Sequence, residues 1–203
     1  MMDDVRFLLS PAADDGKFTV VIGGEHSVTL PAVECHGDVS VISIDAHLDS
    51  RGEFMGSRYS HACVMRRCAD VLGTENVFVL GVRSVSEEEL ESDDPVPYID
   101  SYKIMEKGID WAVGKALKAV KNENVYLTVD IDGIDPAFAP GTGTPEPFGL
   151  TPVDVKKIIN MIGKRLVGFD VNEISPPYDP SGVTSVLGAR LVKEALAVRS
   201  TFI

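Results

Sequence analysis

Short apolar runs rich in valine and isoleucine recur along the chain and constrain its fold more than any other feature. The runs are Phe18–Ile22, Val39–Ile44, Val77–Leu80, Val125–Val129 and Leu166–Phe169. Each run is largely apolar throughout instead of alternating with polar residues, which is the pattern of a strand covered on both faces. We therefore predict that these runs form buried parallel strands.

Helical patterns separate the predicted strands. One helix is predicted to begin at Thr151-Pro152, where a capping residue precedes a proline at the first helical position. Its apolar residues recur at helical spacing as far as Ile162, and the ranges Ile109–Val120 and Thr184–Val198 show the same spacing. Strands that alternate with helices predict an α/β fold, with an open, mostly parallel β-sheet and helices on both faces.

The length and composition fit a single domain over residues 1–203 and exclude several classes of partner. The formal net charge of −12 argues against nucleic acid and anionic membranes, because both attract basic surfaces. No apolar run reaches the roughly 18 residues of a membrane span, and the N-terminal segment is acidic with an apolar core too short for a signal peptide. The three cysteines contain no CxxC pair. We expect a cytoplasmic protein with reduced thiols.

Four of the predicted strands run directly into segments that carry chemically reactive side chains. These segments are Gly23–Ser27, Asp45–Asp49, Asp130–Gly133 and Asp170–Glu173. In an open parallel sheet, ligands bind beyond the carboxyl ends of the strands, so the four segments can converge on one crevice. A single Asp-x-Asp pair is usually a turn or a helix cap. Four such segments in the same structural position instead indicate a functional site.

Carboxylates and imidazoles dominate these segments. Asp45, His47 and Asp49 alternate along the chain, so an extended segment places them on one side, and the same holds for Asp130 and Asp132. Clustered carboxylates at the edge of an apolar core would repel one another without a cation. A site with many carboxylates and few imidazoles suits manganese or magnesium better than zinc or copper. The pattern predicts a metal-dependent hydrolase and leaves its substrate open.

The motifs together resemble those of the ureohydrolase family, which includes arginase and agmatinase. GGEHS, DAHLD, VDIDGIDPAFAPGTGTP and FDVNEISPPYD occur in the family's order, and the resemblance covers about residues 23–198. The family fold, an open parallel sheet flanked by helices, agrees with the pattern of strands and helices. The resemblance implies two Mn²⁺ ions per chain and hydrolysis of a guanidinium C–N bond with release of urea.

The resemblance also implies roles for individual residues at the metal site. His26 would bind one manganese ion and His47 the other. Asp45 and Asp130 would bridge the two ions. Asp49 would complete the first site, and Asp132 would complete the second.

Three more residues resemble positions of the family that handle the substrate and its proton. Glu173 resembles the carboxylate that pairs with the substrate guanidinium, a match of both charge and shape. Thr144 resembles a residue that lies behind the metal ligands, beside that guanidinium. His61 resembles the histidine that shuttles protons toward the leaving amine, and Asp49 offers a second route for the proton.

The motifs favour agmatine, cleaved to putrescine and urea, as the small cationic substrate. The segments Tyr59-Ser60-His61 and Ser175–Asp179 look more like those of prokaryotic agmatinases than those of arginases. Arg51 or Arg58 can instead bind a substrate carboxylate, which keeps guanidinobutyrate open beside arginine and aminopropylagmatine.

Family members carry a longer portion before the GGEHS motif than the 22 residues found here. The resemblance therefore implies that an N-terminal part is lacking, and a non-catalytic metal-binding homologue is the alternative to an enzyme. By analogy with the family we expect a homo-oligomer, either a trimer or a hexamer.

Overall fold

A six-stranded parallel sheet forms the centre of the computed structural model, which describes residues 1–200. The strands lie side by side in the order β1-β6-β5-β2-β3-β4, and every neighbouring pair is parallel. Their bounds are β1 Thr19–Ile22, β2 Ser40–Ile44, β3 Val77–Val82, β4 Tyr98–Asp100, β5 Val125–Asp130 and β6 Leu166–Asn172. The prediction of an open, mostly parallel sheet is confirmed, and each of the predicted strands forms.

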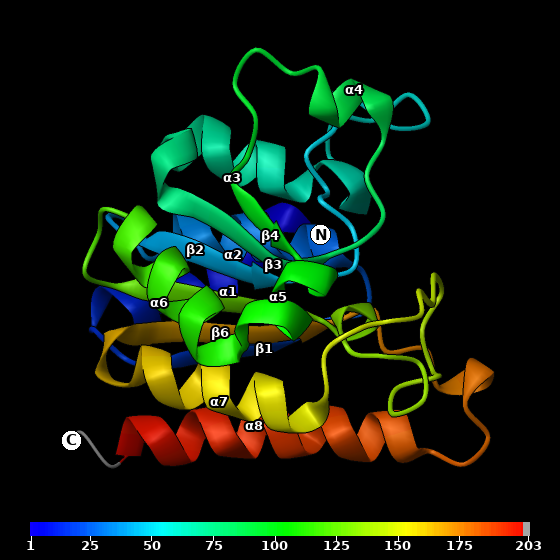
Figure 1. Ribbon diagram of the computed structural model, residues 1–203. Coiled ribbons are helices and arrows are strands. Elements are labelled where there is room, and N and C mark those ends of the chain that lie inside the picture. The colour runs from blue at the N-terminus through cyan, green and yellow to red at the C-terminus, as the bar shows by residue number, and fades with distance from the viewer. Residues whose placement is uncertain (201–203) are drawn as a thin grey trace.

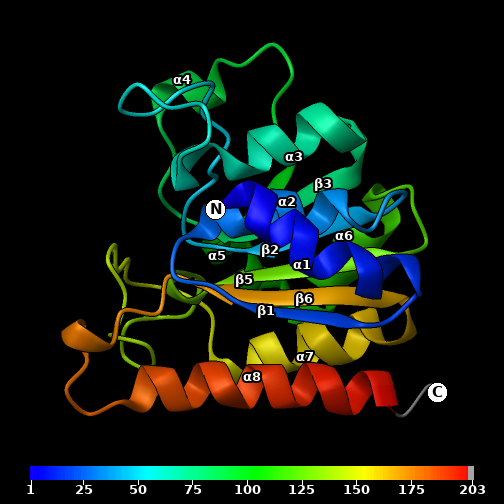
Figure 2. The same cartoon turned by 180° about the vertical axis from the view of Figure 1, so that it is seen from behind.

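Helices cover both faces of this sheet (Figures 1 and 2). Side chains of α1, α2 and α3 pack on one face, and those of α5, α6, α7 and α8 pack on the other. The short helix α4 follows β3 and lies away from both layers in Figure 1. The bounds are α1 Met2–Asp14, α2 Thr29–Glu34, α3 Val64–Leu72, α4 Glu87–Leu90, α5 Ser101–Lys107, α6 Ile109–Ala119, α7 Pro152–Ile162 and α8 Val183–Ser200.

The start of α7 follows the capping signal in the sequence. The Thr151 hydroxyl accepts a hydrogen bond from the backbone N–H of Asp154 at 3.2 Å, and the Asp154 carboxylate accepts the backbone N–H of Thr151 at 3.0 Å. These two bonds satisfy N–H groups that have no partner within the helix. Pro152 takes the first helical position, where the missing N–H costs nothing.

The interior strands explain the apolar runs of the sequence. β2, β3 and β5 are buried along their whole lengths, because helices cover both of their faces. Two apolar clusters result, one between the sheet and each helical layer. Within residues 1–200, no helix is both long and apolar enough to cross a lipid bilayer.

Candidate metal centre

Four neighbouring strands end at the same edge of the sheet and bring the predicted site residues together. β1, β6, β5 and β2 are consecutive in the sheet. His26 follows β1, Asp45 and His47 follow β2, Asp130 ends β5, and Glu173 follows β6. The predicted convergence of these segments beyond the carboxyl ends of the strands is therefore what the fold produces.

The first group of candidate metal ligands surrounds one ring nitrogen. His26 Nδ1 lies 3.2 Å from Asp49 Oδ2, 3.3 Å from Asp45 Oδ2 and 3.4 Å from Asp130 Oδ2. One ligand atom of each residue lies within 4.8 Å of those of the others. All four residues are buried. Three carboxylates and an imidazole thus point at one another inside the protein.

The second group shares a carboxylate with the first. It consists of Asp45, His47 and Asp132, and His47 Nδ1 lies 3.1 Å from Asp132 Oδ2 and 3.7 Å from Asp45 Oδ1. A carboxylate common to both groups is placed as a bridge between two cations would be. Asp130, the other predicted bridge, falls in the first group, and its Oδ1 accepts the backbone N–H of Asp132 at 2.9 Å.

Clustered, buried carboxylates make both ligand groups strongly negative, so nearby positive charge stabilises them. Burial raises the pKa of Asp49 to about 7, with a further contribution from the negative charge of Asp45. Burial likewise raises the pKa of Asp130 well above its usual value. For His47 burial favours the neutral ring, but the carboxylates of Asp132 and Asp45 outweigh it and raise the pKa to about 11. Without cations, protons supply the positive charge that the carboxylates require.

The donor atoms fit a pair of oxygen-preferring divalent cations. Asp45 Oδ2 is buried and has no hydrogen-bond partner among the described residues. A buried carboxylate oxygen without a partner is costly, and a metal ion would satisfy it. Four carboxylates and two imidazoles are also the kind of ligand set that suits manganese. The residues present therefore fit the metal that the sequence predicts.

A chain of polar side chains behind the ligands orients His26. Its Nε2 lies 2.9 Å from Thr128 Oγ1, which lies 3.1 Å from Thr29 Oγ1, and Thr29 donates to Asp170 Oδ2 at 2.9 Å. When His26 Nε2 carries the ring proton and donates to Thr128, Nδ1 keeps its lone pair for a cation. Neither threonine was predicted from the sequence. A threonine inside a buried strand, as at position 128, is the signal that could have found one of them.

Two residues of the site adopt left-handed backbone conformations. The φ angles are 50° at Asp49 and 60° at Glu173. Side chains other than glycine disfavour this region by about 1–2 kcal/mol per residue, and functional sites often retain such strain. The Glu173 backbone N–H donates to the Gly24 carbonyl at 2.8 Å, and the Asp49 carbonyl accepts the Met65 N–H at 2.9 Å. These bonds hold the strained segments and aim both carboxylates into the site.

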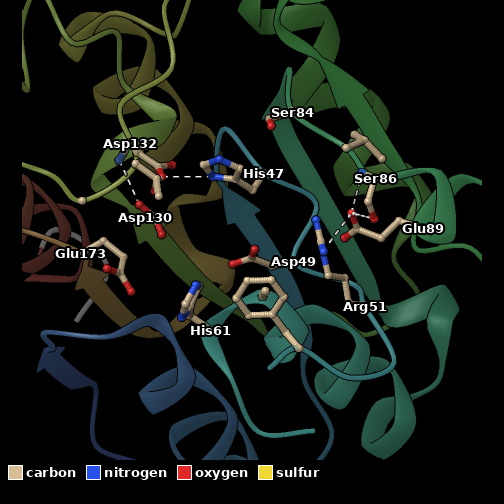
Figure 3. A pocket seen from close by; sticks show the side chains of 15 residues that line it. His47, Asp49, Arg51, His61, Ser84, Ser86, Glu89, Asp130, Asp132 and Glu173 are labelled. Atoms are coloured by element: carbon tan, nitrogen blue, oxygen red, sulfur yellow. Dashed lines mark hydrogen bonds and ion pairs between the residues drawn. The ribbon is translucent and has the colours of Figure 1, made fainter. Parts of the chain in front are cut away.

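A cavity of about 490 Å³ lies against the candidate ligands and includes the predicted substrate residues (Figure 3). Glu173, His61 and Thr144 all line it. Glu173 Oε1 accepts the backbone N–H of His26 at 2.8 Å, and burial raises the pKa of this carboxyl group. The Thr144 hydroxyl donates to Asp132 Oδ2 at 2.9 Å, so this residue supports a candidate ligand directly.

The two arginines that were predicted as alternative partners of a substrate carboxylate differ in their position relative to the cavity. Arg51 lines the cavity, and its Nε lies 4.0 Å from Glu89 Oε2. In Figure 3 these two residues lie across the cavity from Glu173. The Arg58 side chain is 64% exposed and lies 3.9 Å from Asp70, and it is not among the residues that line the cavity. Arg51 alone of the pair is placed to meet a substrate.

Arg83 is a further residue that was not predicted from the sequence. Its Nη2 donates to the carbonyl oxygens of Asp132 at 2.6 Å and Glu146 at 2.7 Å, and its Nη1 donates to that of Gly81 at 2.9 Å. The guanidinium group thus ties the end of β3 to the loop that carries Asp132 and Thr144. Its partners are backbone carbonyls, which leave no signal in the sequence.

Two named relatives are similar to this chain in sequence. A guanidinobutyrase of Pseudomonas aeruginosa is 36% identical over 194 residues, which cover 90% of this chain and 61% of that protein. An agmatinase of Halalkalibacterium halodurans is 35% identical over 190 residues, 90% of this chain and 64% of that protein. The chain therefore spans about three fifths of the length of these relatives.

Comparison with solved structures and with protein families gives the same result as the sequence relatives. The crystal structure of agmatine ureohydrolase of Thermoplasma volcanium superposes with a TM-score of 0.94 at 44% identity, over 99% of this chain and 69% of that one. The arginase family model matches residues 1–198, so the resemblance found in the motifs is confirmed. The chain belongs to the arginase family.

Proposed function

We propose that this chain hydrolyses the C–N bond of a guanidinium compound, releasing urea and an amine, and that it acts on agmatine to give putrescine. One observation carries the proposal: the half-buried carboxylate of Glu173 lines the same cavity as four of the six candidate metal ligands, namely His47, Asp49, Asp130 and Asp132. A carboxylate pairs with a guanidinium group through two parallel hydrogen bonds, so the substrate carbon would lie over the ligands.

Two manganese ions are the proposed cofactor. His26, Asp45, Asp49 and Asp130 would hold one ion, and Asp45 and Asp130 would be shared with the other. His47 and Asp132 complete the ligand set of the second ion. When bound, such a metal pair supplies an activated water near neutral pH and stabilises negative charge in the reaction.

The protein's own residues bind and orient the substrate and move the proton. The backbone N–H of His26 fixes the Glu173 carboxylate, and its partial burial favours pairing with a cationic group. His61 lines the same cavity and would deliver the proton that the leaving amine requires, with Asp49 as the second route. Thr144 steadies Asp132 through its hydroxyl group.

Agmatine is preferred on the strength of the comparisons, and guanidinobutyrate is the second candidate. The relative of known structure that is named agmatine ureohydrolase is 44% identical, and the agmatinase is 35% identical. The guanidinobutyrase, at 36% identity, supports the second candidate together with Arg51, whose guanidinium group reaches the cavity wall opposite Glu173. A substrate carboxylate would pair with Arg51, whereas the amine of agmatine would not.

Urea release by manganese-loaded protein from agmatine, guanidinobutyrate, aminopropylagmatine and arginine tests the proposal. Agmatine should give the highest kcat/KM, and Glu173→Gln should lower it at least 100-fold, or by about 3 kcal/mol, through loss of the charged pair. A preference for guanidinobutyrate that Arg51→Met removes and Arg58→Met leaves intact would establish the second candidate. If none of these compounds yields urea, the proposed hydrolysis is wrong and the chain is a non-catalytic metal-binding homologue.

A further inference from the structure

The glutamate of the GGEHS motif contacts the residue proposed for proton transfer. Glu25 Oε1 accepts the backbone N–H of His61 at 2.8 Å and lies 3.4 Å from Nδ1 of the same residue. Glu25 Oε2 accepts the hydroxyl hydrogen of Ser27 at 2.5 Å. Both carboxylate oxygens are therefore engaged, and the side chain is held in one orientation between its own loop and His61.

An aromatic ring contacts the His61 imidazole as well. The Phe54 ring meets it edge to face, with the ring centroids 5.8 Å apart and the planes 68° apart. The Arg51 guanidinium carbon lies 5.1 Å from the centroid of Phe54, so Phe54 is itself in contact with a cation. Glu25 and Phe54 thus both restrict the imidazole.

His61 needs such restraint because its other side-chain contact is long, with Ser60 Oγ 3.5 Å from Nδ1. It begins a short 3₁₀ helix, His61–Cys63, and its side chain is 45% exposed. Proton transfer requires the donor and acceptor atoms to be about 2.6–3.2 Å apart, which a freely rotating surface ring rarely achieves. With Nδ1 beside Glu25, Nε2 is the ring nitrogen left to exchange a proton with a substrate in the cavity.

We propose that Glu25 is a positioning residue that holds the His61 imidazole toward the cavity. This inference rests on the proposed function, since it assumes that His61 serves the leaving amine. The loop after β1 then organises three groups at once. The His26 ring is a candidate ligand, the His26 N–H orients Glu173, and the Glu25 carboxylate orients His61.

A double-mutant cycle separates positioning from a general structural role. Glu25→Ala should lower kcat for agmatine at least about tenfold and leave KM within about twofold, because the bound substrate is unchanged. In a His61→Ala background the same substitution should change kcat by less than about twofold. Glu25→Gln, which keeps an oxygen to accept the His61 N–H, should restore part of the rate.

Glu88→Ala is the matched control. Glu88 Oε1 accepts the backbone N–H of Gly52 at 3.2 Å, so it also ties a carboxylate to the loop before His61, but without contacting the imidazole. This variant should keep the wild-type kcat within about twofold. Manganese content, measured on every variant, should stay at the wild-type value, which shows that the neighbouring His26 still binds its ion.

A crystal structure of Glu25→Ala provides a readout that does not depend on activity. The His61 ring should leave its position beside the cavity or lose its density. If the ring stays in place, or if the Glu25 and His61 substitutions lower kcat independently and multiplicatively, the positioning role is wrong. If the wild-type protein releases no urea from any guanidino compound, the proposed function fails, and the position of the His61 ring still decides whether Glu25 holds it.

Discussion

Asp45 is the residue that joins the two candidate ligand groups. It is fully buried, its Oδ1 accepts the backbone N–H of His47 at 2.7 Å, and its Oδ2 faces His26 Nδ1 at 3.3 Å. Burial opposes ionisation of this carboxyl group, but the adjacent imidazoles of His26 and His47 outweigh it and lower the pKa to about 2. Asp45 thus stays charged more readily than Asp49 or Asp130, as suits a bridge between two cations.

Asp132 belongs to the second ligand group only, so its substitution should empty mainly one metal position. For Asp132→Asn, manganese content measured by mass spectrometry should fall from about two ions to about one ion per chain, since a neutral amide binds a divalent cation more weakly. The control Asp135→Asn changes a carboxylate that accepts backbone N–H groups outside both ligand groups. The Asp135→Asn variant should keep both manganese ions. Equal metal content in the two variants would contradict the two-site assignment.

At the scale of residues, the six candidate ligands could be predicted because they lie at or just beyond the ends of recognisable apolar strands, in motifs that resemble those of the family. Several residues that hold the candidate ligands or His61 in place were not predicted, whereas Thr144, which donates to Asp132, was. Thr128 sits among strand residues, and Glu25 reaches a backbone N–H that is 36 positions away. Such contacts arise only when the strands are ordered in the sheet, so local spacing does not predict them, and the polar residue Thr128 inside a buried strand is the one signal that the sequence offers.

Arg83 connects elements that are distant in sequence, and its loss should destabilise the fold. Arg83→Met removes the donors of three short hydrogen bonds to backbone carbonyls. Carbonyls left without a partner in a half-buried site should lower the free energy of unfolding by about 3 kcal/mol. Urea denaturation followed by circular dichroism measures this change. Arg58→Met, at a side chain that is 64% exposed, should change it by less than about 0.5 kcal/mol, and equal values for both variants would refute the connecting role.

Asp179 caps the start of α8 and gives this element a pH-dependent contribution. Hydrogen bonds from the Ser181 hydroxyl and the Thr184 backbone N–H lower the pKa of Asp179 from 3.8 to about 2. Because the folded-state pKa lies below the unfolded one, this contribution is complete above about pH 4 and is lost as the pH falls to about 2.

The comparison of wild type with Asp179→Asn isolates that contribution, because all other groups titrate alike in both proteins. The difference in Tm should be constant near neutral pH and shrink steadily between about pH 4 and about pH 2.5. A difference that stays constant down to the lowest pH would show that the hydrogen bonds to Asp179 do not depend on its charge.

At the scale of elements, the continuous apolar runs and the long apolar helix faces were predicted correctly, whereas elements with few buried apolar residues were not. α7 and α8 have long apolar faces and were found, whereas β4, a three-residue edge strand, has Ile99 as its buried residue. Every residue of α1 keeps some exposure to solvent, so its apolar face is weak. Short elements depend on their neighbours for stability, and their sequences therefore carry little periodic signal.

The order of the strands is the property of the whole molecule that creates the site. β1, β6, β5 and β2 are neighbours although β1 and β6 are far apart in sequence, and this order brings His26, Glu173, Asp130 and Asp45 to one edge. The right-handed connections of parallel strands favour such an arrangement. Assembly into a trimer or a hexamer stays a prediction, which light scattering coupled to size-exclusion chromatography measures.

We propose that two metal ions in this centre serve hydrolysis of a guanidinium compound. Urea release from agmatine by metal-free protein, to which manganese is added in measured equivalents, tests this proposal. The rate should rise until about two equivalents per chain are bound and then stay constant, because both ligand groups must be filled. No urea from agmatine or guanidinobutyrate with two ions bound would contradict the proposed hydrolysis, and a full rate with a single ion would contradict the need for two metals.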